Sequence, residues 1–389
     1  MYFQILDNKK ECYAIYCDNE LYYYPNGLEL SKTWNWSCHA PLAPDVAEIW
    51  SGGLSLKQAC PEDLKDDLKR IQDKGMAFLK ALSTSKVRLD DVCFYDLVPK
   101  KYLLEYCEIK NKISKYVFEH YKRPANYDFQ VELASLLNKI SSREISFSNQ
   151  RISGLSVVER NKYQHARNFK KISYNQWGSK TGRLTTKQNS FPILTLPKTL
   201  RAMLVPNNDL FVELDYNSAE ARVVLALSGK PQPSIDIHEH IRQEVYNNKY
   251  TRDETKQKVF AWLYNPKAKN KKLSSYFDKE NLLNKYYLDG VVNTPFNRQI
   301  VAPEAKALNY LIQSAASDMF LRQAIKINQL LKGKKSEIAF CVHDSLVLDV
   351  SREDKDTLQD VMSFFKKTDL GDFMTNASIG KNYGSMRSL

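Results

Sequence analysis

Two apolar runs near the C-terminal end of the chain are separated by only three residues. IAFCV at 338–342 and LVLDV at 346–350 flank the tripeptide His343-Asp344-Ser345. Strand-length apolar runs joined by so short a polar link predict a β-hairpin with a carboxylate at its tip. The chain must therefore contain an antiparallel sheet that presents an acid at one end.

A second acid follows another predicted strand. LFVEL at 210–214 predicts that strand, Asp215 comes directly after it, and a helix is expected over about 218–227. Taken singly, Asp215 has the ordinary interpretation of a helix-capping residue and Asp344 that of a turn residue. Taken together, two rigid carboxylates about one metal diameter apart can hold a pair of Mg²⁺ ions, which stabilise the attacking and leaving oxygens of a phosphoryl transfer. Two acids can suffice, because substrate phosphates complete the coordination of Mg²⁺.

The segment from Thr251 predicts a helix with a well-defined start, because Thr251 and Glu254 form a T-x-x-E capping box. Four side chains then recur at every fourth residue: Arg252, Lys256, Phe260 and Tyr264. A cation at the positive end of a helix is disfavoured, and an anionic ligand docked there would reverse that penalty. Arg and Lys one turn apart match a triphosphate, and the two rings would stack on its base and sugar. The alternative is an exposed basic edge with two core aromatics.

Other segments complete the predicted layout of a chain whose 389 residues suit two or three packed subdomains. We expect a hairpin over 11–24, a helix from 61 to about 82, an antiparallel pair of helices over about 99–121 and 127–141, a helical and polar stretch over 236–300 interrupted by Pro266, and a long helix from Pro303 to about 332 capped by Gly333.

Composition excludes several classes of protein. No apolar run of about 18 residues exists and the N-terminus lacks a secretory signal, so no membrane association is expected. Seven scattered cysteines, Cys38 among them, form no zinc pattern, which indicates reduced thiols and a cytoplasmic location. The net charge of +12 favours a polyanionic partner, and residues 99–171 hold 15 Lys/Arg against 7 Asp/Glu. A solvated helical surface would explain that local charge equally well.

Six motifs occur in a fixed order along the second half of the chain. They are Thr181-Gly182-Arg183-Leu184; Asp215-Tyr216-Asn217-Ser218-Ala219-Glu220-Ala221-Arg222; Asp236-Ile237-His238; Arg252-x3-Lys256-x3-Phe260-x3-Tyr264; Asn309-x3-Gln313 followed by Ala315-Ala316-x-Asp318; and Val342-His343-Asp344. In these residues the chain resembles family A DNA polymerases, the DNA polymerase I family. The similarity covers about 174–384 and includes the tail Gly380-Lys381-Asn382-Tyr383. One such motif would carry little weight, whereas six in order, at compatible spacing, are specific.

The resemblance implies an α+β, right-hand polymerase with an antiparallel-sheet palm, helical fingers and a helical thumb. It assigns the segments as follows: 1–95 to a short N-terminal region, 96–172 to the thumb, 173–230 and 301–389 to the two parts of the palm, and 231–300 to the fingers. The form is compact and phage-like, and we expect it to lack a 3′–5′ exonuclease. The acidic segment Asp18-Asn19-Glu20 reads better as a hairpin turn than as an exonuclease motif.

The resemblance also implies the reaction: template-directed extension of a primer with dNTPs, in DNA replication or repair, by two-metal-ion nucleotidyl transfer. Two Mg²⁺ ions, or Mn²⁺ in their place, would be held by Asp215, Asp344 and the backbone carbonyl of Tyr216. Lys256 is the expected proton donor to the leaving pyrophosphate.

Two further sets of residues are implied by the same motifs. Those expected to bind the dNTP are Arg252, Lys256 and His238 at the triphosphate, Phe260 and Tyr264 in the nucleotide pocket, and Glu220 against the sugar 2′ position. Those expected to contact the primer–template are Arg183, Arg298, Asn309, Gln313 and His343. Contacts in the minor groove check the shape of a base pair without selecting a sequence.

The chain departs from the family pattern at several positions. Asn265 and Asn297 stand where glycine is usual, and Asn tolerates left-handed backbone better than most residues. Ser345 replaces the acid that usually follows Asp344, so a third metal-site carboxylate is missing at that position. Two more replacements are Ser218 for a Gln and Ala305 for an Arg, the latter beside Lys306. Fewer minor-groove contacts predict lower fidelity.

Three alternatives stay open. A phage-type single-subunit RNA polymerase shares the Arg-x3-Lys helix and often the His-Asp-Ser sequence, although Glu220 argues against it. A decayed polymerase would only grip primer–template, and a basic RNA-binding protein would show no metal-dependent activity. For the polymerase, the expected partners are primer–template DNA, dNTPs and a replication accessory protein. The polymerase is expected to act as a monomer in the cytoplasm, that of a host if it is viral.

Overall fold

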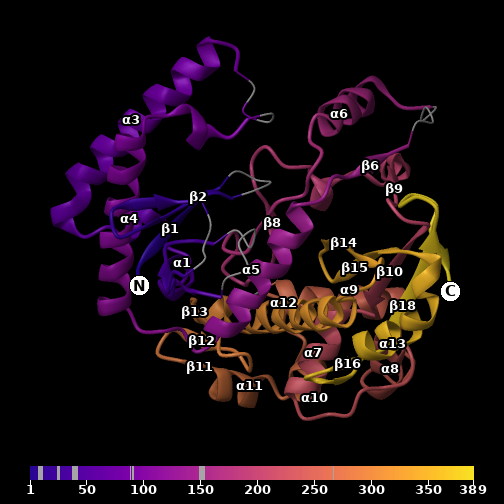
Figure 1. Ribbon diagram of the computed structural model, residues 1–389. Coiled ribbons are helices and arrows are strands. Elements are labelled where there is room, and N and C mark those ends of the chain that lie inside the picture. The colour runs from indigo at the N-terminus through magenta and orange to yellow at the C-terminus, as the bar shows by residue number, and fades with distance from the viewer. Residues whose placement is uncertain are drawn as a thin grey trace. The chain divides into compact units, whose positions relative to one another are not determined.

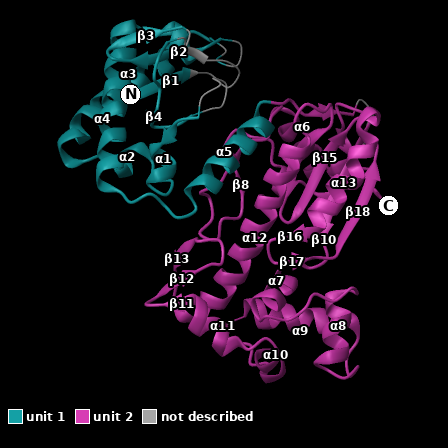
Figure 2. Cartoon of the chain, turned by 60° about the horizontal axis from the view of Figure 1, so that its bottom comes forward, with its two compact units in different colours: residues 1–142 teal, residues 143–389 magenta. Residues whose placement is uncertain are grey.

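The computed structural model describes residues 1–7, 12–23, 27–36, 43–87, 89, 92–148, 154–265 and 267–389. Residues 11 and 24 of the expected hairpin, Cys38 and Pro266 lie outside the described residues. The chain forms two compact units, Met1–Ser142 (unit 1) and Arg143–Leu389 (unit 2), shown in Figures 1 and 2. The boundary between them falls inside the segment 96–172 that the family resemblance assigns to the thumb. Among the described helices, none is long and apolar enough to cross a membrane.

Unit 1 combines small sheets with helices. Strands β1, β2 and β3 form an antiparallel sheet in that order, and β4 pairs in parallel with β5. The strands are β1 Phe3–Asp7, β2 Cys12–Cys17, β3 Glu20–Tyr22, β4 Lys32–Thr33 and β5 Asp45–Val46. The helices are α1 Ala47–Trp50, α2 Leu56–Ala59, α3 Lys65–Thr84, α4 Lys100–His120 and α5 Tyr127–Ser141, with 3₁₀ turns at Glu62–Leu64 and Phe94–Leu97.

The hairpin predicted in unit 1 is confirmed, because β2 and β3 pair across Asp18 and Asn19, whose φ angles are 49° and 62°. Such a pair of left-handed residues is what a two-residue hairpin turn requires. The predicted antiparallel pair of α4 and α5 is wrong, because α5 is not a main packing partner of α4. Helix α4 instead packs its buried face against α1, α2 and α3, so little of that face is left for α5.

A five-stranded antiparallel sheet forms the centre of unit 2 (Figure 1). Its strands run in the order β14-β15-β10-β18-β19. They are β10 Leu210–Tyr216, β14 Glu337–Val342, β15 Ser345–Val350, β18 Thr375–Gly380 and β19 Arg387–Ser388. The predicted strand at 210–214 and the predicted hairpin around Asp344 are both confirmed.

The two faces of β10 carry different side chains. Leu214 and Tyr216 are buried, and the Tyr216 ring stacks on Phe365 of α13 (Lys355–Lys366) with ring centroids 4.3 Å apart. Glu213 and Asp215 alternate with these residues and are half-buried. Because side chains alternate across a strand, the helix-covered face is apolar and the opposite face carries the acids.

Unit 2 contains further helices and short strands around this sheet. The helices are α6 Val157–Arg167, α7 Ala219–Leu227, α8 Ile237–Glu244, α9 Arg252–Tyr264, α10 Lys271–Tyr276, α11 Lys279–Tyr286 and α12 Glu304–Leu330. Short pairs are β6 Ser146–Phe147 with β9 Leu204–Val205, β7 Tyr174–Asn175 with β8 Thr185–Thr186, and β16 Lys367–Thr368 with β17 Gly371–Asp372. There are 3₁₀ turns at Ile193–Thr195, Lys198–Met203 and Arg352–Asp354. The long helix predicted from Pro303 is confirmed as α12, and Gly333 follows its end with φ 78°.

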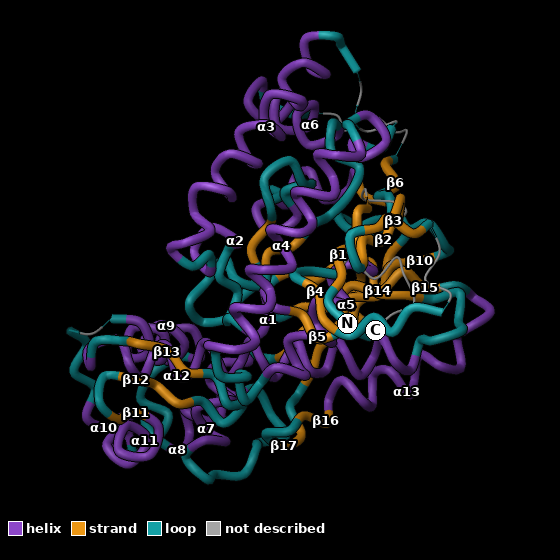
Figure 3. The backbone as a smooth tube through the Cα atoms, turned by 60° about the vertical axis from the view of Figure 1, so that its left-hand side comes forward, coloured by secondary structure: helices purple, strands orange, loops and turns teal. Residues whose placement is uncertain are grey.

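The stretch 236–300 was expected to be helical throughout, and this prediction is wrong at its C-terminal end. A three-stranded antiparallel sheet forms there (Figure 3), made of β11 Tyr287–Leu288, β12 Val291–Asn293 and β13 Gln299–Val301. Asp289 and Gly290 form the β11–β12 turn with φ of 51° and 77°. An Asp-Gly pair beside β-branched residues is a strong local hairpin signal, and it overrides the helical pattern before it.

The two asparagines that stand in place of glycine differ in conformation. Asn297, in the β12–β13 connection, has φ 61° and so uses the left-handed region that glycine would provide. Asn265, at the end of α9, has φ −99° and ψ 107°. That backbone is extended, so residue 265 needs no glycine.

Candidate active site

The sheet brings Asp215 and Asp344 to the same end. β10 and β15 pair with Asp215 opposite Ser345, and Val342 pairs with Ser345 across the turn that carries His343 and Asp344. Residues directly opposite on neighbouring strands have Cβ atoms about 4.5–5.5 Å apart. Asp344, which is next to Ser345 in the chain, therefore lies beside Asp215, as the two-carboxylate interpretation requires.

The turn between β14 and β15 is tight. His343 is exposed and has φ 57°, a left-handed conformation that few non-glycine residues adopt. A conformation of this kind persists only where the surrounding structure imposes it. Here the paired strands on both sides impose it and hold Asp344 at the tip.

Asp215 and Asp344 are a pair of uncompensated acids. Burial, then the charge of Asp344, then that of Glu213 raises the pKa of Asp215 to about 7, while a hydrogen bond from Asn376 opposes the shift. Burial also raises the pKa of Asp344, while a backbone hydrogen bond and the charges of His343 and Arg183 oppose the shift more weakly. Neither acid forms an ion pair within the described residues. Two like charges held together out of water favour protonation or a bound cation.

A divalent cation fits this pair, because carboxylate and carbonyl oxygens are the ligands that Mg²⁺ prefers. The backbone carbonyl of Tyr216 is next to Asp215, whereas the Tyr216 hydroxyl donates a hydrogen bond of 2.7 Å to the Phe365 carbonyl on the other face. Throughout the described parts of the chain, no three His, Cys, Asp or Glu side chains are clustered so that they could hold a metal. The protein therefore offers two acids and leaves other positions to water and substrate oxygens.

A third acid, Glu213, lies on the same face of β10 two residues before Asp215. Its Oε1 accepts a hydrogen bond of 2.6 Å from Ser345 Oγ and a longer one of 3.4 Å from the Tyr383 hydroxyl. The motifs do not include Glu213. The alternation of side chains along a strand was the signal that could have found it.

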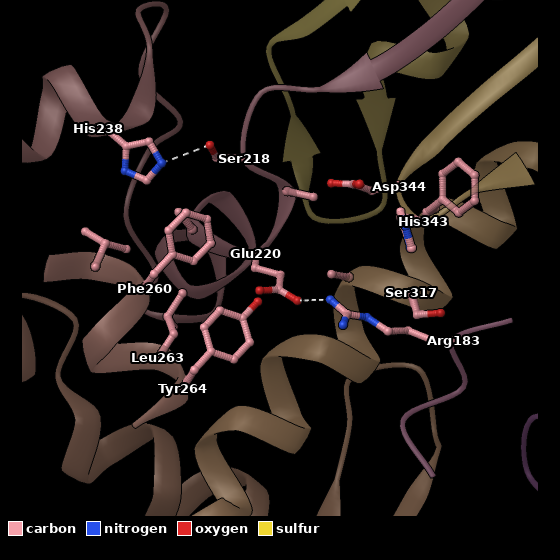
Figure 4. A pocket seen from close by; sticks show the side chains of 15 residues that line it. Arg183, Ser218, Glu220, His238, Phe260, Leu263, Tyr264, Ser317, His343 and Asp344 are labelled. Carbon is pink, nitrogen blue, oxygen red and sulfur yellow. Dashed lines mark hydrogen bonds and ion pairs between the residues drawn. The ribbon is translucent and has the colours of Figure 1, made fainter. Parts of the chain in front are cut away.

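A pocket of about 170 Å³ lies beside Asp344. Its lining comes from α7, α8, α9, α12, the β14–β15 turn and the loop before β8. Among the predicted site residues it brings together Arg183, Glu220, His238, Phe260, Tyr264, His343 and Asp344. Figure 4 shows His343 and Asp344 on one side of this pocket, Phe260, Leu263 and Tyr264 on the other, and Glu220 between them.

Glu220, in the first turn of α7, forms an ion pair with Arg183 across the pocket. The Glu220 side chain is 12% exposed and that of Arg183 is 49% exposed. Burial raises the pKa of Glu220, the Arg183 guanidinium opposes this, and the charge of Asp344 adds to it. Arg183 is thus the cation that favours the charged form of Glu220.

His238 lines the pocket as a neutral ring. It is fully buried, and its Nε2 lies 3.0 Å from Ser218 Oγ. Burial lowers the pKa of His238 to about 4, so the ring carries no charge at pH 7. Its Nδ1 is buried and has no hydrogen-bond partner among the described residues. The ring therefore lines the pocket without contributing a positive charge.

Helix α9 begins with the predicted capping box, which is confirmed. Thr251 Oγ1 accepts a hydrogen bond from the Glu254 N–H at 3.2 Å, and the Glu254 carboxylate accepts one from the Thr251 N–H at 2.8 Å. Further along, the rings of Phe260 and Tyr264 stack with centroids 5.8 Å apart, and both side chains remain more than a third exposed. A flat exposed aromatic pair suits the stacking of a base.

Arg252 is already engaged by Asp236. Its Nε and Nη2 donate hydrogen bonds of 3.1 and 2.7 Å to the two carboxylate oxygens of Asp236. Burial raises the pKa of Asp236, but hydrogen bonds from Arg252 and Asn217 outweigh this effect and hold that pKa well below its usual range. The Lys256 ammonium lies 5.8 Å from the centroid of the Phe260 ring. Neither Arg252 nor Lys256 lines the pocket beside Asp344.

Arg298 is largely buried and pairs with an acid. Its side chain is 11% exposed and donates hydrogen bonds of 3.0 and 2.7 Å to Asp318 of α12, which is fully buried. Gly182, with φ 76°, lies against this guanidinium, and a Cβ atom there would come within 2.7 Å of it. Ser317 Oγ also donates a hydrogen bond of 3.0 Å to the Gly182 carbonyl. The Arg298–Asp318 pair therefore supports the loop that carries Arg183.

Asn309 and Gln313 lie about one turn apart on α12. Asn309 Nδ2 donates a hydrogen bond of 3.3 Å to the Leu263 carbonyl of α9. It lines a second pocket, of about 530 Å³, with Tyr264 and Lys306 among the other lining residues. Gln313 is half-buried. Neither residue lines the pocket beside Asp344, but Asn309 contacts Leu263, which lines both pockets.

Sequence reasoning also missed the partners of the predicted cations. Asp236 and Asp318 were each noted within a motif, but nothing in the sequence paired Asp236 with Arg252 or Asp318 with Arg298. These partners are 16 and 20 residues apart. Such distances exceed the spacing at which side chains meet along one helix.

Comparisons with known proteins find similarity in sequence and in fold. No protein-family model matches the chain. The chain is similar to the DNA polymerase I of Caldicellulosiruptor bescii, at 25% identity over 241 residues, which is 48% of this chain and 28% of that protein. The chain thus spans less than a third of that relative's length.

The fold is similar to that of a solved structure. The polymerase domain of Pol1 from M. smegmatis, in complex with DNA primer-template and dNTP, superposes with a TM-score of 0.57 at 13% identity, over 73% of this chain and 76% of that chain. The predicted α+β polymerase fold is therefore confirmed, and so is the resemblance to family A DNA polymerases. The compact, phage-like form without an exonuclease stays a prediction.

Proposed function

From this relationship to the DNA polymerase I family, we propose that the chain is a DNA-directed DNA polymerase, which extends a primer with dNTPs under the direction of a template. The observation that carries the proposal is the pair Asp215 and Asp344 beside a pocket lined by Glu220, Phe260 and Tyr264. Two acids without an ion-pair partner next to a pocket lined by aromatic side chains suit a metal-dependent nucleotidyl transfer. Neither feature would be expected in a basic protein that only binds RNA.

Two Mg²⁺ ions, or Mn²⁺ in their place, would supply the positive charge that stabilises the attacking and leaving oxygens. Asp215 and Asp344 would hold them, together with the backbone carbonyl of Tyr216. The strand β10 and the β14–β15 turn keep the two carboxylates in fixed positions before any ligand arrives. Such preorganisation avoids the cost of reordering the site during the reaction.

The residues of α8 and α9 would bind the incoming nucleotide. Arg252 and Lys256 would hold the triphosphate, and Lys256 would protonate the pyrophosphate as it leaves. For this, Arg252 must exchange the Asp236 carboxylate for phosphate oxygens. The exchange is open to it because the Arg252 side chain is 45% exposed. His238 would add a neutral hydrogen bond.

Sugar selection would fall to Glu220. Its carboxylate lies between the aromatic pair of α9 and Asp344 (Figure 4) and is held by Arg183. A ribonucleotide would bring its 2′-hydroxyl against this fixed carboxylate, so deoxynucleotides are favoured. Phe260 and Tyr264 would stack on the base.

The primer–template would be contacted by Arg183, His343, Asn309 and Gln313. In this proposal Arg298 does not contact DNA. It is held by Asp318 and supports the Gly182–Arg183 loop, because its guanidinium packs against Gly182. Exposed Lys306 beside Ala305 would supply a further contact to the phosphate backbone. Such phosphate contacts position DNA without reading its sequence.

The subdomain assignment belongs to the same proposal. Residues 231–300 would act as fingers, 173–230 and 301–389 as palm, and 96–172 as thumb. We propose that the described chain does not proofread, since its Asp18–Glu20 segment is a hairpin turn. A monomer in the cytoplasm, aided by a replication accessory protein, is the form expected to act.

Primer extension tests the proposal directly. Wild-type protein with Mg²⁺, primer–template and dNTPs should extend the primer, Asp344→Ala should not, and Glu353→Ala, which removes an exposed acid at another site, should behave as wild type. A mismatched 3′ end should not be removed. Extension with ribonucleotides instead would favour an RNA polymerase. Tight primer–template binding with no extension would leave a decayed binding module.

A further inference from the structure

The catalytic face carries an acid that the polymerase motifs do not include. Glu213 lies two residues before Asp215 on β10, so the two side chains project from the same face of the sheet. Glu213 is half-buried and forms no ion pair within the described residues. Its negative charge therefore adds to that of Asp215 and Asp344.

The groups that contact Glu213 come from two other segments. Ser345, directly opposite Asp215 on β15, donates its hydroxyl hydrogen to Glu213 Oε1 over 2.6 Å. The Tyr383 hydroxyl donates to the same oxygen over 3.4 Å. Both donors are neutral, so they orient the carboxylate without cancelling its charge. Ser345 follows Asp344 directly in the chain and thereby connects Glu213 to the turn that carries Asp344.

Ser345 occupies the position where the family motif usually has an acid. A carboxylate at 345 would project from the same face as Asp215, because the two residues are paired across β10 and β15. In this chain that position has a hydroxyl, and the carboxylate comes from β10 instead. The Ser345 and Glu213 side chains form a hydrogen bond with each other. The Glu213 carboxylate therefore lies on a different strand from position 345 but close to it on the same face of the sheet.

We propose that Glu213 is a positioning residue for the divalent cation at Asp215 and Asp344, and that it replaces the acid missing at position 345. The inference rests on the proposed function. Glu213 would act through the Ser345 hydroxyl and bound water rather than as a direct ligand, because the described residues form no three-residue metal cluster. A partner of this kind orients the ligands and raises the local negative charge.

Binding of Mn²⁺ to the full chain, followed by electron paramagnetic resonance, tests the inference without an activity assay. Glu213→Gln should weaken Mn²⁺ binding by about tenfold, the lower end of the effect of removing a partner behind metal ligands. Ser345→Ala should weaken it by a smaller factor. The exchange variant Glu213→Ser with Ser345→Glu returns the acid to position 345, so it should bind Mn²⁺ much more tightly than Glu213→Gln does. Glu353→Gln, which removes an exposed charge, is the control.

Thermal unfolding in the absence of metal separates misfolding from a loss of binding. A variant that unfolds as wild type does, yet binds Mn²⁺ more weakly, supports the inference. Equal binding by Glu213→Gln and Glu353→Gln overturns it, and so does an exchange variant that binds no better than Glu213→Gln. If the wild type binds no more Mn²⁺ than Asp344→Asn does, the proposed metal site fails as well, which distinguishes the two failures.

Discussion

Asp215, Asp344 and Asp318 are all partly or fully withdrawn from solvent, but their partners differ. Asp318 accepts two hydrogen bonds from the Arg298 guanidinium, at 3.0 and 2.7 Å. Asp215 and Asp344 form no ion pair within the described residues, and the charges of His343 and Arg183 act on Asp344 only as weaker opposing effects. Burial raises the pKa of Asp318 too, but Arg298 opposes that shift, and the two-pronged geometry is that of a charged pair.

The difference separates structural acids from acids that bind. A buried acid with its own guanidinium is satisfied and supports a loop. Two neighbouring acids without an ion-pair partner repel each other, and the proposed metal ion would relieve that repulsion. Arg252 and Asp236 are an intermediate case: the geometry is that of the Arg298 pair, but the side chains are 45% and 21% exposed. Because both side chains are partly exposed, Arg252 can exchange the Asp236 carboxylate for another anion.

The largest expected effect comes from removing an uncompensated acid. Asp344→Asn should lower the rate of primer extension by a thousandfold or more, about 4 kcal/mol of barrier, because the divalent cation loses a ligand. The metal-free protein should unfold at the same temperature as the wild type or above it. A variant that loses activity only because it unfolds would contradict the contrast with Asp318, and a melting curve distinguishes the two.

Removing the compensated acid should affect folding first. Asp318→Asn leaves Arg298 buried without a counter-charge, which should cost about 3–5 kcal/mol of unfolding free energy. Chemical denaturation measures it. Replacing both partners, as in Asp318→Leu with Arg298→Met, should cost much less, because no charge is left unpaired. If the double variant is as unstable as the single one, the unpaired charge of Arg298 is not the cause of the instability.

Neutralising Asp215 should stabilise the metal-free protein at neutral pH. The pKa of Asp215 is raised to about 7 in the folded state, so its ionisation opposes folding, and stability falls as pH rises from about 4 towards 7. Asp215→Asn should therefore be more stable than wild type by about 2–4 kcal/mol above pH 7 and show no advantage near pH 4. Denaturation at both pH values measures this, and excess Mg²⁺ should reduce the difference. A constant difference at both pH values would exclude titration of Asp215 as its cause.

The exposed pair should show the smallest effect, and mainly on substrate binding. Arg252→Ala should raise KM for the dNTP by about 10–100-fold, as expected for loss of a charge-assisted contact to phosphate, with unfolding free energy changed by less than about 1 kcal/mol. Asp236→Asn keeps an acceptor at the start of α8 and frees Arg252, so it should lower KM. Steady-state kinetics measure both. A stability loss as large as that of Asp318→Asn would place Arg252 among the structural residues.

Local signals predicted most of the elements that position the site. The strand before Asp215, the hairpin around Asp344 and the Thr251 capping box each depend on residues within a few positions of one another, and all were predicted from the sequence. The strands at 287–301 also depend on a local signal, because the Asp289-Gly290 turn that starts them is present in the sequence.

What the sequence alone determined about this protein was the main strands and helices that carry the site, its family resemblance and the identity of most residues around the pocket. The tertiary structure decided which of those residues carry an uncompensated charge. It buried Arg298 against Asp318, paired Arg252 with Asp236, and placed Glu213 beside Ser345. The physical reason is range: backbone propensities act between neighbours in the chain, whereas charge pairing and desolvation depend on which distant segments meet and how much water they exclude.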